Sequence, residues 1–170
     1  HHAVMEFQVV TDRQLPKIRA GRSWVTFHFR KDLTAVHDGV VERKTDTGTM
    51  KVSSPELTAL DLLRYIHVAG GIDAVATVTA DLGKKIDGAK LAAMAPHFDR
   101  ACVQRLGYLL DRLGHAECAQ ALYDQLSATK SVPWVALEPA KRETGAPPPK
   151  PVERNKRWRV LVQRHPEVDE

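Results

Sequence analysis

The chain has 170 residues, with 25 Lys and Arg against 21 Asp and Glu, so its formal net charge is +4. Hydrophobic residues make up 43% and charged residues 27% of the sequence, which is typical of a globular protein and argues against wholesale disorder. The length predicts one domain, and no apolar run approaches the roughly 20 residues that a membrane span requires. Only two cysteines occur and no secretory leader is visible, so we expect a reducing, cytoplasmic setting.

The first third of the chain has the pattern of β-strands. Met5–Val10 is a short apolar run, and Ser23–Arg30 alternates with the period of two that a half-buried strand shows. Asp38-Gly39 is a dipeptide typical of a tight hairpin turn, here between short strands over 33–37 and 40–43. A second turn signal, Thr45–Gly48, precedes a further strand. Together these segments predict an antiparallel meander of about four strands.

The middle of the chain changes to the 3.6-residue period of helices. Ser53 and Glu56 form the S-x-x-E pattern of a capping box, with Pro55 in the first turn. Gly107 lies inside the strongest helical pattern, where it costs about 1 kcal/mol relative to alanine, and so predicts a close contact between helices. Five helices are expected, over about residues 54–69, 73–82, 88–95, 99–113 and 116–128.

The last part of the chain returns to loop and strand. The Pro-rich segment Glu138–Lys156 has no apolar period, so we expect a long mobile or extended loop. Trp158, Val160 and Val162 recur at every second position, which predicts a closing strand. The predicted fold class is α+β, with a small antiparallel sheet built from both ends of the chain and packed against about five central helices. In chain order we expect strands over about 5–53, helices over 54–128, the Pro-rich loop over 138–156 and the closing strand over 157–164.

No motif for cofactor, nucleotide or zinc-hydrolase chemistry occurs, so we assign no catalytic residue, no cofactor and no metal ligand. One enzymatic alternative stays open. Glu42 and Lys44 form an E-x-K tripeptide with Asp32 or Asp38 upstream. Metal-dependent nucleases use these residue types to hold a divalent ion and to neutralise the attacked phosphate. The other interpretation is a hairpin strand whose charged residues face water.

The clearest electrostatic feature is the stretch Arg13–Lys31, which contains no acidic residue. Basic patches attract phosphate backbones through counterion release, without sequence information, so a non-specific DNA-contacting accessory domain is a further alternative. A solvated face is the simpler interpretation, and it is favoured for the second basic excess, over Lys141–Arg164. The candidate nucleic-acid-binding residues are the six basic residues of the first stretch: Arg13, Lys17, Arg19, Arg22, Arg30 and Lys31.

Five segments together carry a resemblance to a known family: FQVVTDR (Phe7–Arg13), GRSWVTFHFRK (Gly21–Lys31), VSSPELTALDLLRY (Val52–Tyr65), RLGYLLDRLG (Arg105–Gly114) and NKRWRVLVQR (Asn155–Arg164). In this order they resemble the C-terminal domain of AbiEi-type antitoxins, from type IV toxin–antitoxin and abortive-infection systems. The S-P-E-x-T-x-x-D-L-L and R-L-G-x-L-L-x-x-x-G patterns carry most of the likeness.

The resemblance implies an antitoxin and transcriptional regulator that counters a nucleotidyltransferase-type toxin in phage defence and represses its own operon by binding DNA. It implies action by binding and not by bond chemistry. Full-length members carry a winged helix-turn-helix before this domain, and none precedes Met5 here, so we expect sequence-specific DNA binding to need that missing part. The resemblance also implies that His1-His2-Ala3-Val4 is native, the tail of a helix leading out of the preceding domain, although a histidine pair also fits a tag remnant.

Overall fold

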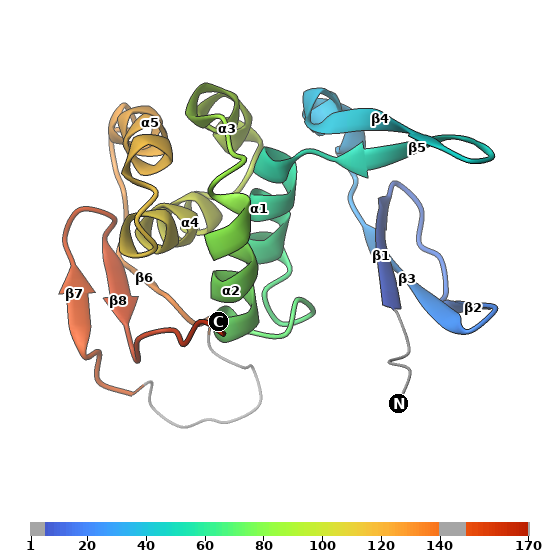
Figure 1. Ribbon diagram of the computed structural model, residues 1–170. Helices are drawn as coiled ribbons and strands as arrows, with labels where there is room; N and C mark the ends of the chain where they lie inside the picture. The colour runs from blue at the N-terminus through green and yellow to red at the C-terminus, as the bar shows by residue number, and fades with distance from the viewer. Residues whose placement is uncertain (1–5, 140–148, 170) are drawn as a thin grey trace. The chain divides into compact units, whose positions relative to one another are not determined.

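The computed structural model describes residues 6–139 and 149–169, and the chain divides into two compact units, His1–Asp38 and Gly39–Glu170 (Figure 1). The predicted α+β class is confirmed, because helices and small sheets are both present. The single domain expected from the chain length stays a prediction. The expectations for residues 1–5 and for the stretch 140–148 of the Pro-rich segment lie outside the described residues.

The first unit is built on a three-stranded sheet of β1 (Glu6–Thr11), β2 (Ile18–Ala20) and β3 (Ser23–Phe29), in the order β1-β3-β2. β1 runs parallel to β3, whereas β2 pairs with β3 as an antiparallel hairpin. The hairpin turn begins at Gly21, whose φ of 61° suits the first central position of a two-residue turn. The strands expected near Met5–Val10 and Ser23–Arg30 are therefore present.

The predicted antiparallel meander is wrong in its pairing and in one of its turns. β1 and β3 are parallel because the connection over 12–22, which includes β2, carries the chain back to the starting end of the sheet. The strand expected over 33–37 is instead part of a 3₁₀ helix, η1 (Leu33–Gly39). Asp38-Gly39 is thus not a hairpin turn, and Gly39 has no positive φ.

Gly39 is the first residue of the second unit, and close packing within that unit explains why it is glycine. A Cβ atom at this position would be 2.6 Å from Met94 Cε and 2.8 Å from Leu57 Cβ. The Gly39 carbonyl also accepts a hydrogen bond from Ser54 N at 2.7 Å. The residue therefore allows the backbone to approach the helices that follow it.

The turn predicted at Thr45–Gly48 is confirmed. It joins β4 (Val40–Thr45) to β5 (Gly48–Ser53) in an antiparallel ladder. In this ladder Glu42 stands opposite Lys51, and Lys44 stands opposite Thr49. The charged residues of the E-x-K tripeptide are exposed, as expected of a solvated hairpin strand.

The five predicted helices are all present in the second unit, together with a short 3₁₀ turn, η2 (Ala95–His97). Their bounds are α1 (Pro55–Arg64), α2 (Ile72–Leu82), α3 (Gly88–Met94), α4 (Arg100–Arg112) and α5 (Ala116–Ser127). α4 is the central helix, packed against α1, α2, α5 and a C-terminal strand (Figure 1). Within the described residues, no helix has the length and apolar character needed to cross a membrane.

The helix α1 begins one residue later than the capping-box prediction places it. Ser54, not Ser53, is the N-cap, and its Oγ accepts a hydrogen bond from Leu57 N at 3.2 Å. Glu56 does not close a capping box, because its carboxylate is buried and accepts a hydrogen bond from Asp87 N at 2.8 Å. Glu56 therefore ties α1 to the start of α3, where the side chain of Asp87 caps the helix.

The C-terminal strands form a separate sheet of β6 (Val135–Ala136), β7 (Glu153–Asn155) and β8 (Val160–Val162), in the order β6-β8-β7. The predicted single antiparallel sheet from both ends of the chain is therefore wrong. β8 pairs with β6 and β7, which lie in the same unit, and its pairing with β6 is parallel. β7 also lies inside the Pro-rich segment for which we predicted only loop.

The closing strand has the buried face that its alternation predicts, since Trp158, Val160 and Val162 are all fully buried. Trp158 also corrects the interpretation of Gly107. A Cβ atom at Gly107 would be 2.1 Å from Cζ3 of the Trp158 ring, so the close approach is to an indole and not to another helix.

Candidate nucleic-acid interface

All six candidate basic residues belong to the first unit, around its three-stranded sheet. Most of these residues lie in the loop after β1, in the hairpin turn or at the end of β3. Connections of this kind run over the protein surface, so most of the six side chains are exposed to solvent. Five of the six are exposed, and we call them the exposed basic group: Arg13, Lys17, Arg19, Arg22 and Lys31.

Arg30 differs from the other five because its side chain is 0% exposed. Its Nε lies 3.0 Å from Asp32 Oδ1, and its backbone N donates to Thr11 O at 2.8 Å, which extends the β1–β3 ladder. A buried guanidinium requires such a partner. Arg30 is therefore a packing residue, and its selection as a phosphate contact does not agree with its burial.

Lys17 is exposed, but its charge is partly neutralised. Its Nζ lies 3.1 Å from Glu6 Oε1 and 5.2 Å from the centroid of the Trp24 ring. A hydrogen bond from the Thr26 hydroxyl, followed by the one from Lys17, lowers the pKa of Glu6, so that this carboxyl group stays ionised beside the lysine. Lys17 consequently presents less free charge than the other members of the exposed basic group.

The other four members present charge that no carboxylate of the described residues pairs with: Arg13, Arg19, Arg22 and Lys31. Arg19 Nε donates to Gly21 O at 3.2 Å, which holds the guanidinium beside the hairpin turn. Exposed arginines and lysines of this kind suit phosphate oxygens, which they bind without reading sequence.

The nuclease alternative requires a metal-binding site, and residues 6–139 and 149–169 do not form one. No three His, Cys, Asp or Glu side chains gather there in a way that could hold a metal ion. Asp32 pairs with Arg30, and Glu42 stands opposite Lys51 on the β4–β5 ladder. Each carboxylate therefore already has a cationic neighbour.

The two cysteines are also unsuited to nucleophilic chemistry. Cys102 in α4 and Cys118 in α5 are both buried free thiols. Burial raises the pKa of Cys102 to about 11, and it raises the pKa of Cys118 as well. The reactive thiolate is therefore scarce at both positions near neutral pH.

A cavity of about 360 Å³ lies beside the start of α2 and is lined by charged side chains as well as glycines. Arg164 is one of the lining residues, and its Nη1 lies 2.7 Å from Asp73 Oδ1 and its Nη2 2.9 Å from Glu138 Oε1. The hydrogen bond from Arg164, and then the one from Glu167 N, lower the pKa of Asp73. Because these groups satisfy one another, the cavity offers little free charge to a ligand.

The second basic excess of the sequence divides in the same way into paired and unpaired residues. Arg164 has the two carboxylates just described, and Arg157 Nε lies 3.2 Å from Asp111 Oδ2. Arg154 and Arg159 are exposed, and no carboxylate of the described residues pairs with them. A count of charges in the sequence does not single out these two residues, because it does not distinguish paired from unpaired arginines.

Comparison with known proteins gives one match. The family model of the AbiEi antitoxin C-terminal domain matches residues 1–112, which is most of the chain. No curated protein and no solved structure matches. The matched segment includes the whole exposed basic group, the β4–β5 hairpin and the helices through the end of α4.

Proposed function

The chain belongs to the family of AbiEi antitoxin C-terminal domains, and from this premise we propose that it counters a nucleotidyltransferase-type toxin in a type IV toxin–antitoxin system. The family itself supports an antitoxin role, with a toxin as the general partner. The match over residues 1–112 is the single observation that carries the proposal. We propose further that the protein acts in the cytoplasm, by binding and not by bond chemistry, as part of phage defence.

We also propose that the exposed basic group contributes to repression of the protein's own operon. Phosphate contacts by arginine and lysine increase affinity and fix orientation on a duplex, but they do not select a sequence. Selection of the operator then belongs to the winged helix-turn-helix that accompanies this domain in the family. Arg13, Arg19, Arg22 and Lys31 support this role because they are exposed and no described carboxylate pairs with them.

Co-expression with the toxin encoded beside this protein tests the antitoxin role. We expect the chain to restore growth of cells that express the toxin. A version that also carries the winged helix-turn-helix should repress an operon reporter. In that version the double variant Arg19→Glu/Arg22→Glu should still restore growth while its repression weakens, since the two roles use different contacts. If the folded chain gives no rescue and a version with the winged helix-turn-helix does, then the antitoxin activity lies elsewhere.

A direct assay tests the non-enzymatic part of the proposal. We expect labelled DNA and labelled RNA to remain intact when they are incubated with the chain and Mg²⁺. Cleavage that disappears in Glu42→Gln and Lys44→Ala variants would instead support the nuclease alternative.

A further inference from the structure

The C-terminal sheet has one face against the helices and one face toward solvent. Val160 and Val162 of β8 are fully buried, so the alternating residue Leu161 points to the other side. Leu161 is paired with Ala136 on one side and with Arg154 on the other, which places these residues on the same outer face. Trp134, two residues before Ala136, is 42% exposed.

The outer face combines an exposed indole with unpaired cations. The Arg154 guanidinium lies 5.8 Å from the centroid of the Trp134 ring. Lys156 and Arg159 are also exposed, and the described part of the chain has no carboxylate paired with them or with Arg154. Arg154 lies on β7, whereas Lys156 and Arg159 lie in the turn between β7 and β8. We call the set of four residues the outer basic face: Trp134, Arg154, Lys156 and Arg159.

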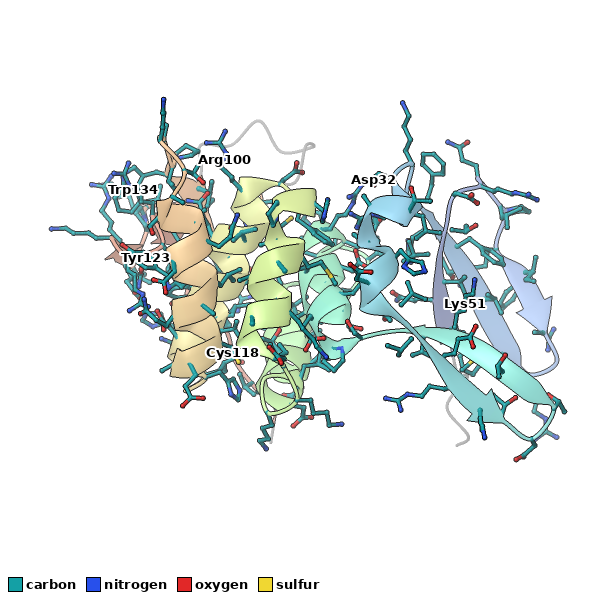
Figure 2. The ribbon with its side chains drawn as sticks, turned by 90° about the horizontal axis from the view of Figure 1, so that it is seen from above. Asp32, Lys51, Arg100, Cys118, Tyr123 and Trp134 are labelled. Carbon is teal, nitrogen blue, oxygen red and sulfur yellow. The ribbon has the colours of Figure 1, made fainter. Side chains whose placement is uncertain are left out.

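The segment that presents Trp134 is held by hydrogen bonds to three consecutive carbonyl groups. Arg100 Nη1 donates to Ser131 O, Arg159 Nη1 donates to Val132 O at 2.9 Å, and Gln104 Nε2 donates to Pro133 O at 2.7 Å. Figure 2 shows Trp134 near Arg100 at the outer edge of the helical part of the molecule. An aromatic side chain on a fixed segment loses less conformational entropy when it binds a ligand.

Arg159 occupies an unusual backbone conformation for its residue type. Its φ of 51° makes it the one non-glycine residue with positive φ among the described residues. This left-handed region favours glycine, so an arginine there is held by its surroundings. Its backbone carbonyl accepts from Val135 N at 3.0 Å while its guanidinium reaches Val132. Arg159 is therefore a positioning residue for the segment that carries Trp134.

We propose that the outer basic face binds single-stranded nucleic acid, with a base stacked on Trp134 and phosphates held by Arg154 and Lys156. Proteins that bind unpaired strands use this combination of exposed aromatic rings and cations, often on a sheet. Duplex DNA keeps its bases stacked inside and gains little from the indole. Trp24 of the first unit is less suited, because its neighbouring cation Lys17 is paired with Glu6.

The proposed site lies outside the segment that the family model matches. Residues 1–112 match the family model, whereas all four members of the outer basic face come later in the chain. The inference therefore goes beyond the antitoxin role, and either one can fail without the other.

Fluorescence anisotropy with the full chain tests the proposal. The probes are labelled oligo(U) RNA and oligo(dT) DNA of about 12 nucleotides, with a labelled duplex of the same length. We expect Trp134→Ala to weaken single-strand binding about tenfold and Trp134→Phe to retain most of it, while duplex affinity changes by less than about twofold. Arg154→Ala should reduce the slope of log affinity against log salt by about one unit.

Two matched controls separate the site from general effects. Trp24→Ala removes an indole of similar exposure, 38%, from the first unit and should leave single-strand binding unchanged. Lys90→Glu, on the exposed surface of α3, is the control for Arg154→Glu, because each variant reverses one charge. We expect Lys90→Glu to weaken single-strand binding much less than Arg154→Glu does. Thermal unfolding of every variant confirms that it is folded, and the ratio of RNA to DNA affinity shows which strand is preferred.

Several results would overturn the assignment. One is single-strand binding that the folded Trp134→Ala variant retains in full, and another is an equal loss in Trp24→Ala. Absence of single-strand binding by the wild-type chain, or an equal loss of duplex binding in Trp134→Ala, would also end it. If Trp134→Ala loses capture of the toxin and keeps single-strand binding, then the outer basic face is a protein interface.

Discussion

Gly107 lies so close to Trp158 that a Cβ atom on the glycine would be 2.1 Å from Cζ3 of the indole. The ring cannot easily move away. Its Nε1 donates to Asp111 Oδ2 at 2.6 Å, and Tyr123 packs edge-to-face against it with a centroid distance of 5.5 Å. The indole of Trp158, in the turn before β8, therefore packs against α4 at Gly107, where no side chain is in the way.

Gly107→Ala should destabilise the protein although alanine is the better helix former. The helix propensity of alanine contributes about 1 kcal/mol in its favour. The clash with the buried indole outweighs it, and we expect a net loss of about 2 kcal/mol in the free energy of unfolding. Urea unfolding followed by circular dichroism measures this loss. In a Trp158→Leu background the same change should be close to neutral, and an undiminished loss there would contradict the explanation.

Glu56→Ala should also be destabilising, because it leaves the amide of Asp87 without its acceptor. This hydrogen bond is only partly buried, so the loss should lie near the lower end of the ~1–3 kcal/mol that an unsatisfied buried donor costs. Glu56→Gln keeps an oxygen at nearly the same place, so its loss should be less than half as large. Hydrogen exchange of the Asp87 amide gives a second measurement. It should become faster in the alanine variant and change little in the glutamine variant.

The ion pair between Asp73 and Arg164 should make stability fall in acid. The pKa of Asp73 is lowered in the folded protein relative to its usual 3.8, so the unfolded chain takes up the proton first. The stabilisation is complete well above pH 4 and is lost as the pH falls through the folded pKa.

Unfolding measured between about pH 3 and pH 7 checks this pH dependence. Asp73→Asn should be less stable than wild type at neutral pH, and the difference should shrink below about pH 4. A constant difference across the range would contradict a role for the carboxylate charge.

DNA binding by the exposed basic group should depend on salt. Arg19→Ala and Arg22→Ala should each reduce the log–log salt slope by about one unit, since each removes one phosphate contact. Arg30→Ala should act differently and lower stability, because it removes a buried guanidinium next to Asp32. Binding that is insensitive to salt would contradict the phosphate-contact interpretation.

Local sequence signals predicted the elements of this fold well. The helices predicted over 88–95 and 99–113 and the turn at Thr45–Gly48 depend on neighbouring residues only, and all three are present. Strand pairing depends on distant residues, and there the predictions failed. Nothing within Glu6–Thr11 shows that it pairs in parallel with Ser23–Phe29.

Residue function was harder to predict than secondary structure, since charge in the sequence does not reveal burial. Arg30 and Arg22 look alike in the basic stretch, but one side chain is buried and the other is in a turn. Alternation in Ser23–Arg30 placed Arg30 on the face of His28, and both residues are buried. The exposure of Trp134 could not be predicted, because the segment that carries it is held by hydrogen bonds from residues far away in the sequence.

The family match ends at Arg112, which is also the last residue of α4. The partners of that helix lie on both sides of this boundary. Gln104 bonds to the carbonyl of Trp158 at 3.0 Å, Arg105 to that of Ala136 at 2.8 Å, and Tyr108 to Glu153 at 3.2 Å. A chain shortened to the matched segment, residues 1–112, would lose these contacts of α4 and expose the apolar side of the helix. The residues after Arg112 thus belong to the same compact unit as α4, and expression trials should not cut between them.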